Sequence, residues 1–123
     1  MAGQNHHFAQ YALEKIPYAI DRYVKETQRL YAVLDRRLAG RPFVAGDYSI
    51  ADIAIYPWIV PHERQGIALA DFPELKRWFE SIRARPSTVA AYEKGKAIGL
   101  PKAMTDEARQ VLFGQSAQTV RRP

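Results

Sequence analysis

Helical spacing dominates the segment PYAIDRYVKETQRLYAVLDRRLAG, residues 17–40. At about 100° per residue, one set of mostly apolar side chains falls within roughly 40° of a single line along a helix. Pro17 suits the first turn of that helix, and Gly40 suits the left-handed position after its end. The pattern predicts a long amphipathic helix whose inward positions are Ile20, Val24, Thr27, Tyr31, Leu34 and Leu38.

The segment GDYSIADIAIYPWI, residues 46–59, predicts the start of a second helix. Ser49 is a favoured N-cap, whose hydroxyl can accept from the N–H of Asp52. Asp52, at N3, can reach back to the N–H of Ser49 and lies at the positive end of the helix dipole. Tyr48 and Ile53 occupy the positions of a hydrophobic staple. These four residues predict a capped helix whose end must be closed.

The helix that follows this cap is apolar nearly all round, so we expect it to lie centrally in the fold. Pro57 should bend it or mark a change of direction. A third helix is predicted over residues 73–86, with Leu75, Trp78, Phe79 and Ile82 directed inward.

Two shorter elements complete the prediction. Residues 87–99 form a fourth helix with Ser87 as its cap, and one or two turns are expected around 107–113. Neither a period-2 strand pattern nor an internal repeat is visible. The fold class predicted is an all-α helical bundle.

Asp52 could also be a catalytic acid or a metal ligand. A catalytic acid needs a partner carboxylate or histidine, and a metal site needs several ligands. The candidates closest in sequence are Asp47 and His62, which are poorly spaced for either role. A cap explains Ser49 and Asp52 together, so the structural interpretation is preferred. We therefore predict that Asp52→Ala costs on the order of 1–2 kcal/mol through the cap alone.

No catalytic residue or metal ligand is predicted elsewhere. The adjacent histidines His6 and His7 could bind a metal only with further ligands, and no cluster supplies them. The sequence also lacks a nucleophile elbow and a glycine-rich phosphate loop.

Composition narrows the setting of the molecule. The 123 residues amount to one domain, with 47% apolar and 25% charged residues and no cysteine. Disulfides and a cysteine nucleophile are thereby excluded. The longest apolar run is too short to cross a bilayer, and the first residues do not read as a signal peptide. A cytoplasmic location without membrane contact is expected.

The formal charge of +5 raises the question of nucleic-acid binding. The basic residues of the long helix lie opposite its apolar stripe, but acidic residues are interleaved and form local ion pairs with them. A nucleic-acid surface needs a denser patch of one sign, so none is predicted. A basic side chain on this face remains free to meet an anionic ligand; the candidates are Arg22, Lys25, Arg29 and Arg36.

Two stretches resemble a known family. FVAGDYSIADIAIYPW and DFPELKRWFESIRARP resemble consecutive helices of the C-terminal domain of glutathione S-transferases. The segments QNHHF and PYAIDRY are similar to one branch in particular, the bacterial Nu-class transferases, which act as glutathione-dependent disulfide-bond oxidoreductases. The resemblance covers nearly the whole chain.

The resemblance implies roles by position. Arg22, in PYAIDRY, would contact glutathione as a co-substrate, without a metal, while Asn5, His6 and His7 would lie at the mouth of the cleft for the second substrate. That substrate would be a small electrophile or a disulfide. Contacts from Tyr11 or Tyr18 are left open. The branch also implies a homodimer.

The family places a thioredoxin-like domain before the helical one, and it supplies most of the glutathione site. No such domain is present in this sequence. We expect residues 1–98 to form the helical domain, with its first helix truncated, and 99–123 an extension. The chain would be inactive without the missing domain and could self-associate through exposed apolar surface. The alternative is a non-catalytic protein-interaction module built on the same helices.

Overall fold

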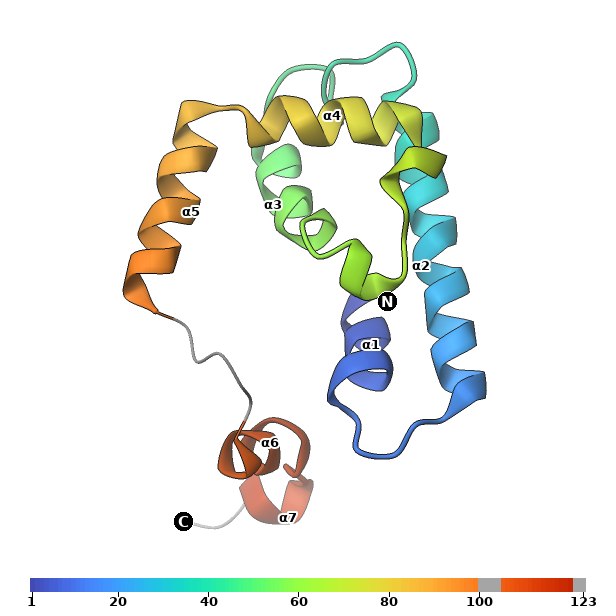
Figure 1. Cartoon of the computed structure of the whole chain (residues 1–123), viewed down its shortest axis with the longest axis vertical. Coiled ribbons are helices and arrows are strands. Elements are labelled where there is room, and N and C mark those ends of the chain that lie inside the picture. The colour runs from blue at the N-terminus through green and yellow to red at the C-terminus, as the bar shows by residue number, and fades with distance from the viewer. Residues whose placement is uncertain (100–104, 121–123) are drawn as a thin grey trace. The chain divides into compact units, whose positions relative to one another are not determined.

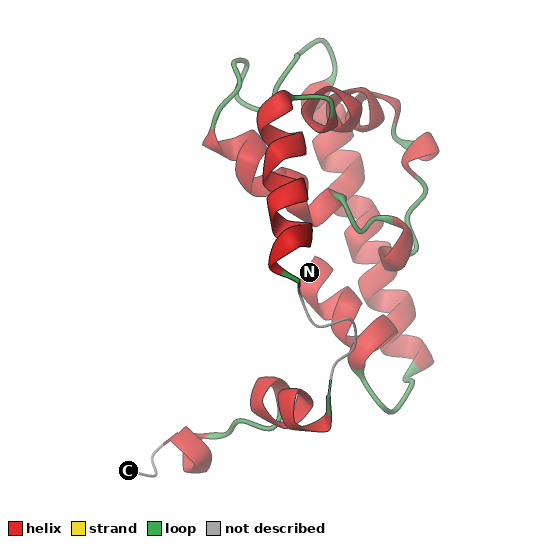
Figure 2. Cartoon of the chain, turned by 60° about the vertical axis from the view of Figure 1, so that its left-hand side comes forward, coloured by secondary structure: helices red, strands yellow, loops and turns green. Residues whose placement is uncertain are grey.

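The computed structural model describes residues 1–99 and 105–120. Figure 2 shows helices joined by loops, and in the described residues the only extended pairing is isolated bridges within the turn at 43–47. The all-α prediction is confirmed. The helices are α1 (Ala2–His6), α2 (Pro17–Leu38), α3 (Ile50–Ile59), α4 (Pro73–Arg83), α5 (Pro86–Ile98), α6 (Asp106–Phe113) and α7 (Ala117–Val120), with a π-helical turn at His7–Tyr11 and 3₁₀ turns at Glu63–Gln65 and Leu69–Asp71.

The chain divides into two compact units, Met1–Val89 and Ala90–Pro123. The division falls inside α5, whereas the sequence places the end of the helical domain at residue 98. In the second unit, the hydroxyl of Thr105 caps α6 by accepting from the N–H of Ala108 at 3.1 Å. That helix covers the segment where a short helix is expected.

The long helix α2 matches its prediction closely. It begins with Pro17 and ends at Leu38, and Gly40 adopts a left-handed conformation with φ of 67°. The fully buried positions come from the predicted inward stripe, because that stripe is the only face apolar enough to be removed from water at low cost. They are Thr27, Tyr31 and Leu38.

Helix α3 is buried on one face only within the first unit. Asp52, Tyr56 and Ile59 point inward. The opposite face is also apolar but exposed: Ile50 is 84%, Ile53 55% and Trp58 54% accessible. We call this second face the outer stripe of α3, defined by Ile50, Ile53, Ala54, Pro57 and Trp58.

Helices α2 and α4 cap each other's ends, and Figure 1 shows α4 crossing the C-terminal end of α2. Asp35 on α2 accepts from the N–H of Leu75 in the first turn of α4 at 2.9 Å. In return, Arg77 on α4 donates to the carbonyls of Leu38 and Arg41, at 3.2 and 2.6 Å. Because helix ends leave backbone groups unpaired, this exchange fixes the crossing as well as satisfying both ends.

The inward face of α4 supplies the centre of the core, as predicted. Leu75 and Trp78 are fully buried, with Phe79 and Ile82 beside them. The rings of Tyr56 and Phe79 stack at 5.2 Å between centroids and hold α3 against α4.

One predicted cap is wrong. Helix α5 begins at Pro86, so Ser87 lies inside its first turn instead of before it. The N–H of Val89 donates to the carbonyl of Arg85 at 3.0 Å, so Arg85, the residue before the helix, accepts the first hydrogen bond of the helix. Proline favours the first helical position because its fixed φ is helical and it has no N–H to leave unpaired.

Candidate functional site

The carboxylate of Asp52 is fully buried and accepts hydrogen bonds from three elements of the first unit. One oxygen accepts from the N–H of Ser49 at 3.0 Å, and both halves of the predicted capping box are present. The hydroxyl of Ser49 also accepts from Ala51 at 3.3 Å. The other oxygen accepts from the indole N–H of Trp78 at 2.8 Å and from the N–H of Val44 at 3.1 Å.

Asp52 is therefore a junction as well as a cap. Burial raises the pKa of its carboxyl, but the hydrogen bonds from Trp78, Val44 and Ser49 outweigh burial and hold the pKa below its ordinary value. A carboxylate kept ionised by donors on every side cannot easily deliver a proton. The geometry supports a structural role.

The staple residues lie differently. Tyr48 packs edge-on against Phe43 and beneath the guanidinium of Arg85, which lies 3.7 Å from the ring centroid. More than half of Ile53 is exposed. The contact between Tyr48 and Ile53 stays a prediction.

Arg22 lies in the first turns of α2, with 56% of its side chain exposed. Its guanidinium is 3.6 Å from the carboxylate of Glu26, which is longer than a hydrogen bond. Arg29 holds the same carboxylate with two hydrogen bonds, at 2.9 and 2.8 Å. Hydrogen bonding from Arg29 lowers the pKa of Glu26 to about 2, with a smaller contribution from Arg22. The carboxylate of Glu26 is thus hydrogen-bonded to Arg29, and Arg22 has only a weak ion pair with it.

Asn5 lies inside the first unit, with 1% of its surface exposed. Its amide donates to the hydroxyl of Thr27 at 3.2 Å and to the carbonyl of Gln65 at 3.0 Å. Gln65 is also buried and bonds to Tyr31 at 2.6 Å and to the carbonyl of Trp58 at 2.8 Å. This network joins α1, α2 and the end of α3. The side chain of Asn5 therefore links these elements from inside the unit and does not reach the surface.

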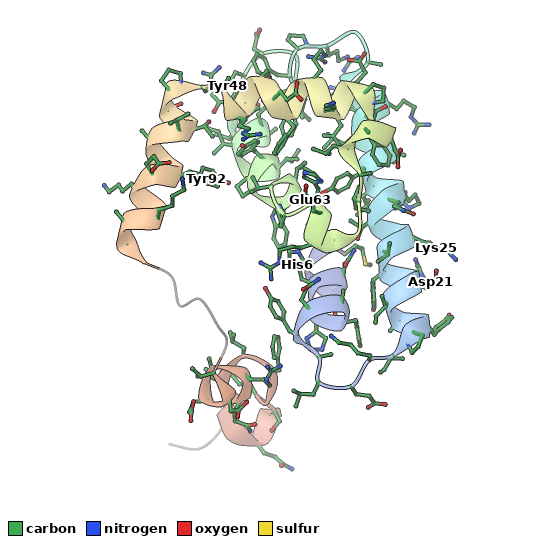
Figure 3. The ribbon with its side chains drawn as sticks, viewed as in Figure 1. His6, Asp21, Lys25, Tyr48, Glu63 and Tyr92 are labelled. Carbon is green, nitrogen blue, oxygen red and sulfur yellow. The ribbon has the colours of Figure 1, made fainter. Side chains whose placement is uncertain are left out.

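The two histidines are partly buried next to a π-helical turn. His6 contacts the edge of Tyr11, and His7 contacts Phe8. Burial lowers the pKa of His6, and the positive charge of Arg64 lowers it further, so the ring is neutral at pH 7. Figure 3 shows His6 on the α1 side, and Asp21 and Lys25 beyond the outer face of α2. A cleft-mouth role for His6 and His7 remains a prediction.

A largely apolar hollow of about 280 Å³ opens beside the start of α1. Its walls come from the middle of α2 and the end of α3, and it reaches the outer stripe of α3 through Trp58. Sequence reasoning missed this hollow, because its walls come together only through packing. The lining residues are Met1, Ala2, Gly3, Thr27, Leu30, Tyr31, Leu34, Trp58 and Ile59.

No three histidine, aspartate or glutamate side chains of residues 1–99 and 105–120 are grouped so that they could hold a metal ion. Within the same residues, no helix is both long enough and apolar enough to span a membrane.

Comparison with known proteins identifies the architecture. The family model described as "Glutathione S-transferase, C-terminal domain" matches residues 14–86, more than half of the chain. The disulfide-bond oxidoreductase YfcG of Escherichia coli is 54% identical over 97 residues, which cover 78% of this chain and 45% of that protein. The chain thus spans less than half the length of this relative.

Solved structures agree with that match. A glutathione transferase from Burkholderia graminis, with two glutathione molecules bound per subunit, has a TM-score of 0.67 and 36% identity, covering 77% of this chain and 43% of that one. A glutathione transferase from Pseudomonas putida, with one glutathione disulfide per subunit, has a TM-score of 0.66 and 38% identity, covering 72% and 42%.

Proposed function

The chain belongs to the glutathione S-transferase C-terminal domain family, and from that premise we propose that it is the helical half of a glutathione-dependent enzyme. The chemistry is thiol transfer or disulfide reduction. Glutathione is the co-substrate, and a small electrophile or disulfide is the second substrate. The proposal includes membership of the Nu class, which rests on the segments QNHHF and PYAIDRY, and the homodimer that this branch implies. It also includes a cytoplasmic setting, which rests on the first residues not reading as a signal peptide.

The loose pairing of Arg22 is the observation that carries this proposal. Its side chain is 56% exposed, and its guanidinium lies 3.6 Å from a carboxylate that Arg29 already binds. A carboxylate of glutathione can therefore engage Arg22 without first breaking a tight ion pair. A guanidinium offers two parallel N–H donors to such a group, which favours bidentate binding.

The apolar surface of the first unit supports a partner domain in the complete enzyme. The outer stripe of α3 and the adjoining hollow expose Ile50, Ile53 and Trp58 together. Contiguous apolar surface of this kind is typical of an interface in a soluble protein. We propose that a thioredoxin-like domain covers it and supplies the group that activates the glutathione thiol. The chain alone would then be inactive.

The test joins this chain to a thioredoxin-like domain from a similar transferase and titrates glutathione by calorimetry. We expect Arg22→Ala to weaken binding about tenfold, since a charge-assisted hydrogen bond contributes about 1.5–3 kcal/mol. Lys25→Ala is the matched control, because Lys25 is also an exposed basic residue of the same helix, at 69% against 56% for Arg22, but pairs with Asp21. Equal affinity in wild type and Arg22→Ala would refute the role of Arg22.

Glu26→Gln sharpens the same experiment. Removing the negative charge of Glu26 releases Arg22 completely, so glutathione should bind more tightly, by about two- to threefold. If the joined protein folds but neither binds glutathione nor reduces a disulfide, the chain is better described as a protein-interaction module.

A further inference from the structure

The C-terminal end of α2 carries a second hollow, which has no part in the proposed glutathione site. Its volume is about 350 Å³, and its lining residues are Val33, Arg36, Arg37, Ala39 and Arg41. Val33, Arg36 and Arg37 share one face of the helix, since residues three and four apart are neighbours there. Arg41 closes the hollow from the turn that follows. Three arginines therefore border one small space.

In the described part of the chain, none of these three arginines has a carboxylate within 4.0 Å, the distance of an ion pair. The nearby Arg77 pairs with Glu74 at 2.9 Å, and Arg22 and Arg29 both face Glu26. Arg37 uses its Nε to donate to the carbonyl of Val44 at 2.9 Å, which anchors its side chain while leaving its charge unpaired. Like charges that lie near one another repel, so binding an anion between the three arginines would reduce their mutual repulsion.

Helix capping does not account for the cluster. Basic residues at the end of a helix commonly serve its last carbonyls and its dipole. Here that role belongs to Arg77, which donates to the carbonyls of Leu38 and Arg41, while the N–H of Arg41 also bonds to Leu38 at 2.9 Å. The side chains of Arg36 and Arg41 have no hydrogen bond to any described residue and remain available.

We propose that this hollow, the α2-end arginine site, binds a multiply charged phosphate-type anion such as pyrophosphate. Arg36 and Arg41 would grip its oxygens as two forks, with Arg37 contributing charge from its anchored position. The volume lies near the lower end of small-molecule sites, which suits a compact anion. Arg36 is 14 residues beyond Arg22, about 21 Å along the helix axis, so the two sites are distinct.

The full 123-residue chain is titrated with inorganic pyrophosphate at constant ionic strength, and amide and arginine Nε–H signals are followed by NMR. We expect saturable shifts at Ala39, Arg36 and Arg41. The double variant Arg36→Gln/Arg41→Gln should bind at least tenfold more weakly. Both side chains are exposed, so its melting temperature should match wild type. Parallel titration with citrate distinguishes phosphate from carboxylate recognition.

The matched control is Lys76→Gln/Arg83→Gln, which removes the same charge from exposed positions of α4. It should bind pyrophosphate within twofold of wild type. Equal loss in both double variants would mean that the net positive charge attracts the anion, and the site would be refuted. Unsaturable shifts in wild type, or citrate binding as tightly as pyrophosphate, would also overturn the proposal.

Discussion

The two faces of α3 have nearly the same apolar character and opposite surroundings. On one face, Tyr56 and Ile59 are 6% and 4% exposed and lie on the same side of the helix as the buried Asp52. On the other, the outer stripe presents Ile50 at 84% exposure. The buried face is distinguished by its one charged group, the carboxylate of Asp52, which accepts from the indole of Trp78 and from the N–H of Val44.

This difference shows that apolar character alone did not decide which face of α3 was covered. The face bearing Asp52 has specific partners on α4 and on the loop before the helix. The side chains of the outer stripe make no hydrogen bond to any other residue that the structure describes. The outer stripe is therefore the surface of α3 most suited to a partner whose contacts are mainly hydrophobic.

The largest expected effect is at Asp52. Asp52→Ala leaves the N–H groups of Trp78, Val44 and Ser49 without their acceptor, and each unpaired buried donor is costly. We expect the free energy of unfolding to fall by about 4 kcal/mol, more than the cap alone would contribute. Urea denaturation measures it, with the exposed neighbour Asp47→Ala as control. A loss below about 1 kcal/mol would contradict the junction role.

A smaller effect separates the two faces directly. Ile59→Ala should lower the free energy of unfolding by about 3 kcal/mol, through lost burial and the cavity left behind. Ile50→Ala, the same substitution on the outer stripe, should change it by less than about 0.5 kcal/mol in the chain alone. Urea denaturation at two protein concentrations checks both. A comparable loss at Ile50 would mean that self-association already covers the outer stripe.

The smallest expected effect is on the pH dependence of the free energy of unfolding, and it comes from the carboxyl group of Asp52. The folded-state pKa of Asp52 lies below its ordinary value of 3.8, so its stabilisation is present above that pH and is lost as the pH falls through the folded pKa. The stability gap between wild type and Asp52→Asn should therefore narrow between pH 5 and pH 2.5. The gap to Ile59→Ala should stay constant, because no ionisable group is altered. A stability difference between wild type and Asp52→Asn that stays constant with pH would contradict the lowered pKa of Asp52.

Local features of this fold could be predicted from the sequence. The 3.6-residue period of α2, its starting Pro17 and the left-handed Gly40 act within a few residues of one another, and so does the exchange between Ser49 and Asp52. The resemblance identified the family and indicated Arg22 as a binding residue. Helix geometry alone predicts that Arg22 is exposed, because Arg22 lies on the face of α2 opposite the buried stripe.

Long-range pairings could not be predicted in this way. Asp35 binds Leu75, and Arg77 binds Leu38, across 40 and 39 residues of sequence. The resemblance suggests a cleft mouth for Asn5, and only the structure shows that its amide joins Thr27 and Gln65 inside the unit. An asparagine near a chain end carries no signal in its sequence context that separates a surface position from an interior strut.

The sequence by itself determined the long helices α2, α3 and α4, the capped start of α3 and the family, because those depend on periodicity and on contacts between near neighbours. Only the tertiary structure decided which face of α3 is covered, which arginine Glu26 retains and which basic residues at the end of α2 are left unpaired. Each of those outcomes depends on a competition among groups brought together by packing, and spacing along the chain does not rank such competitors.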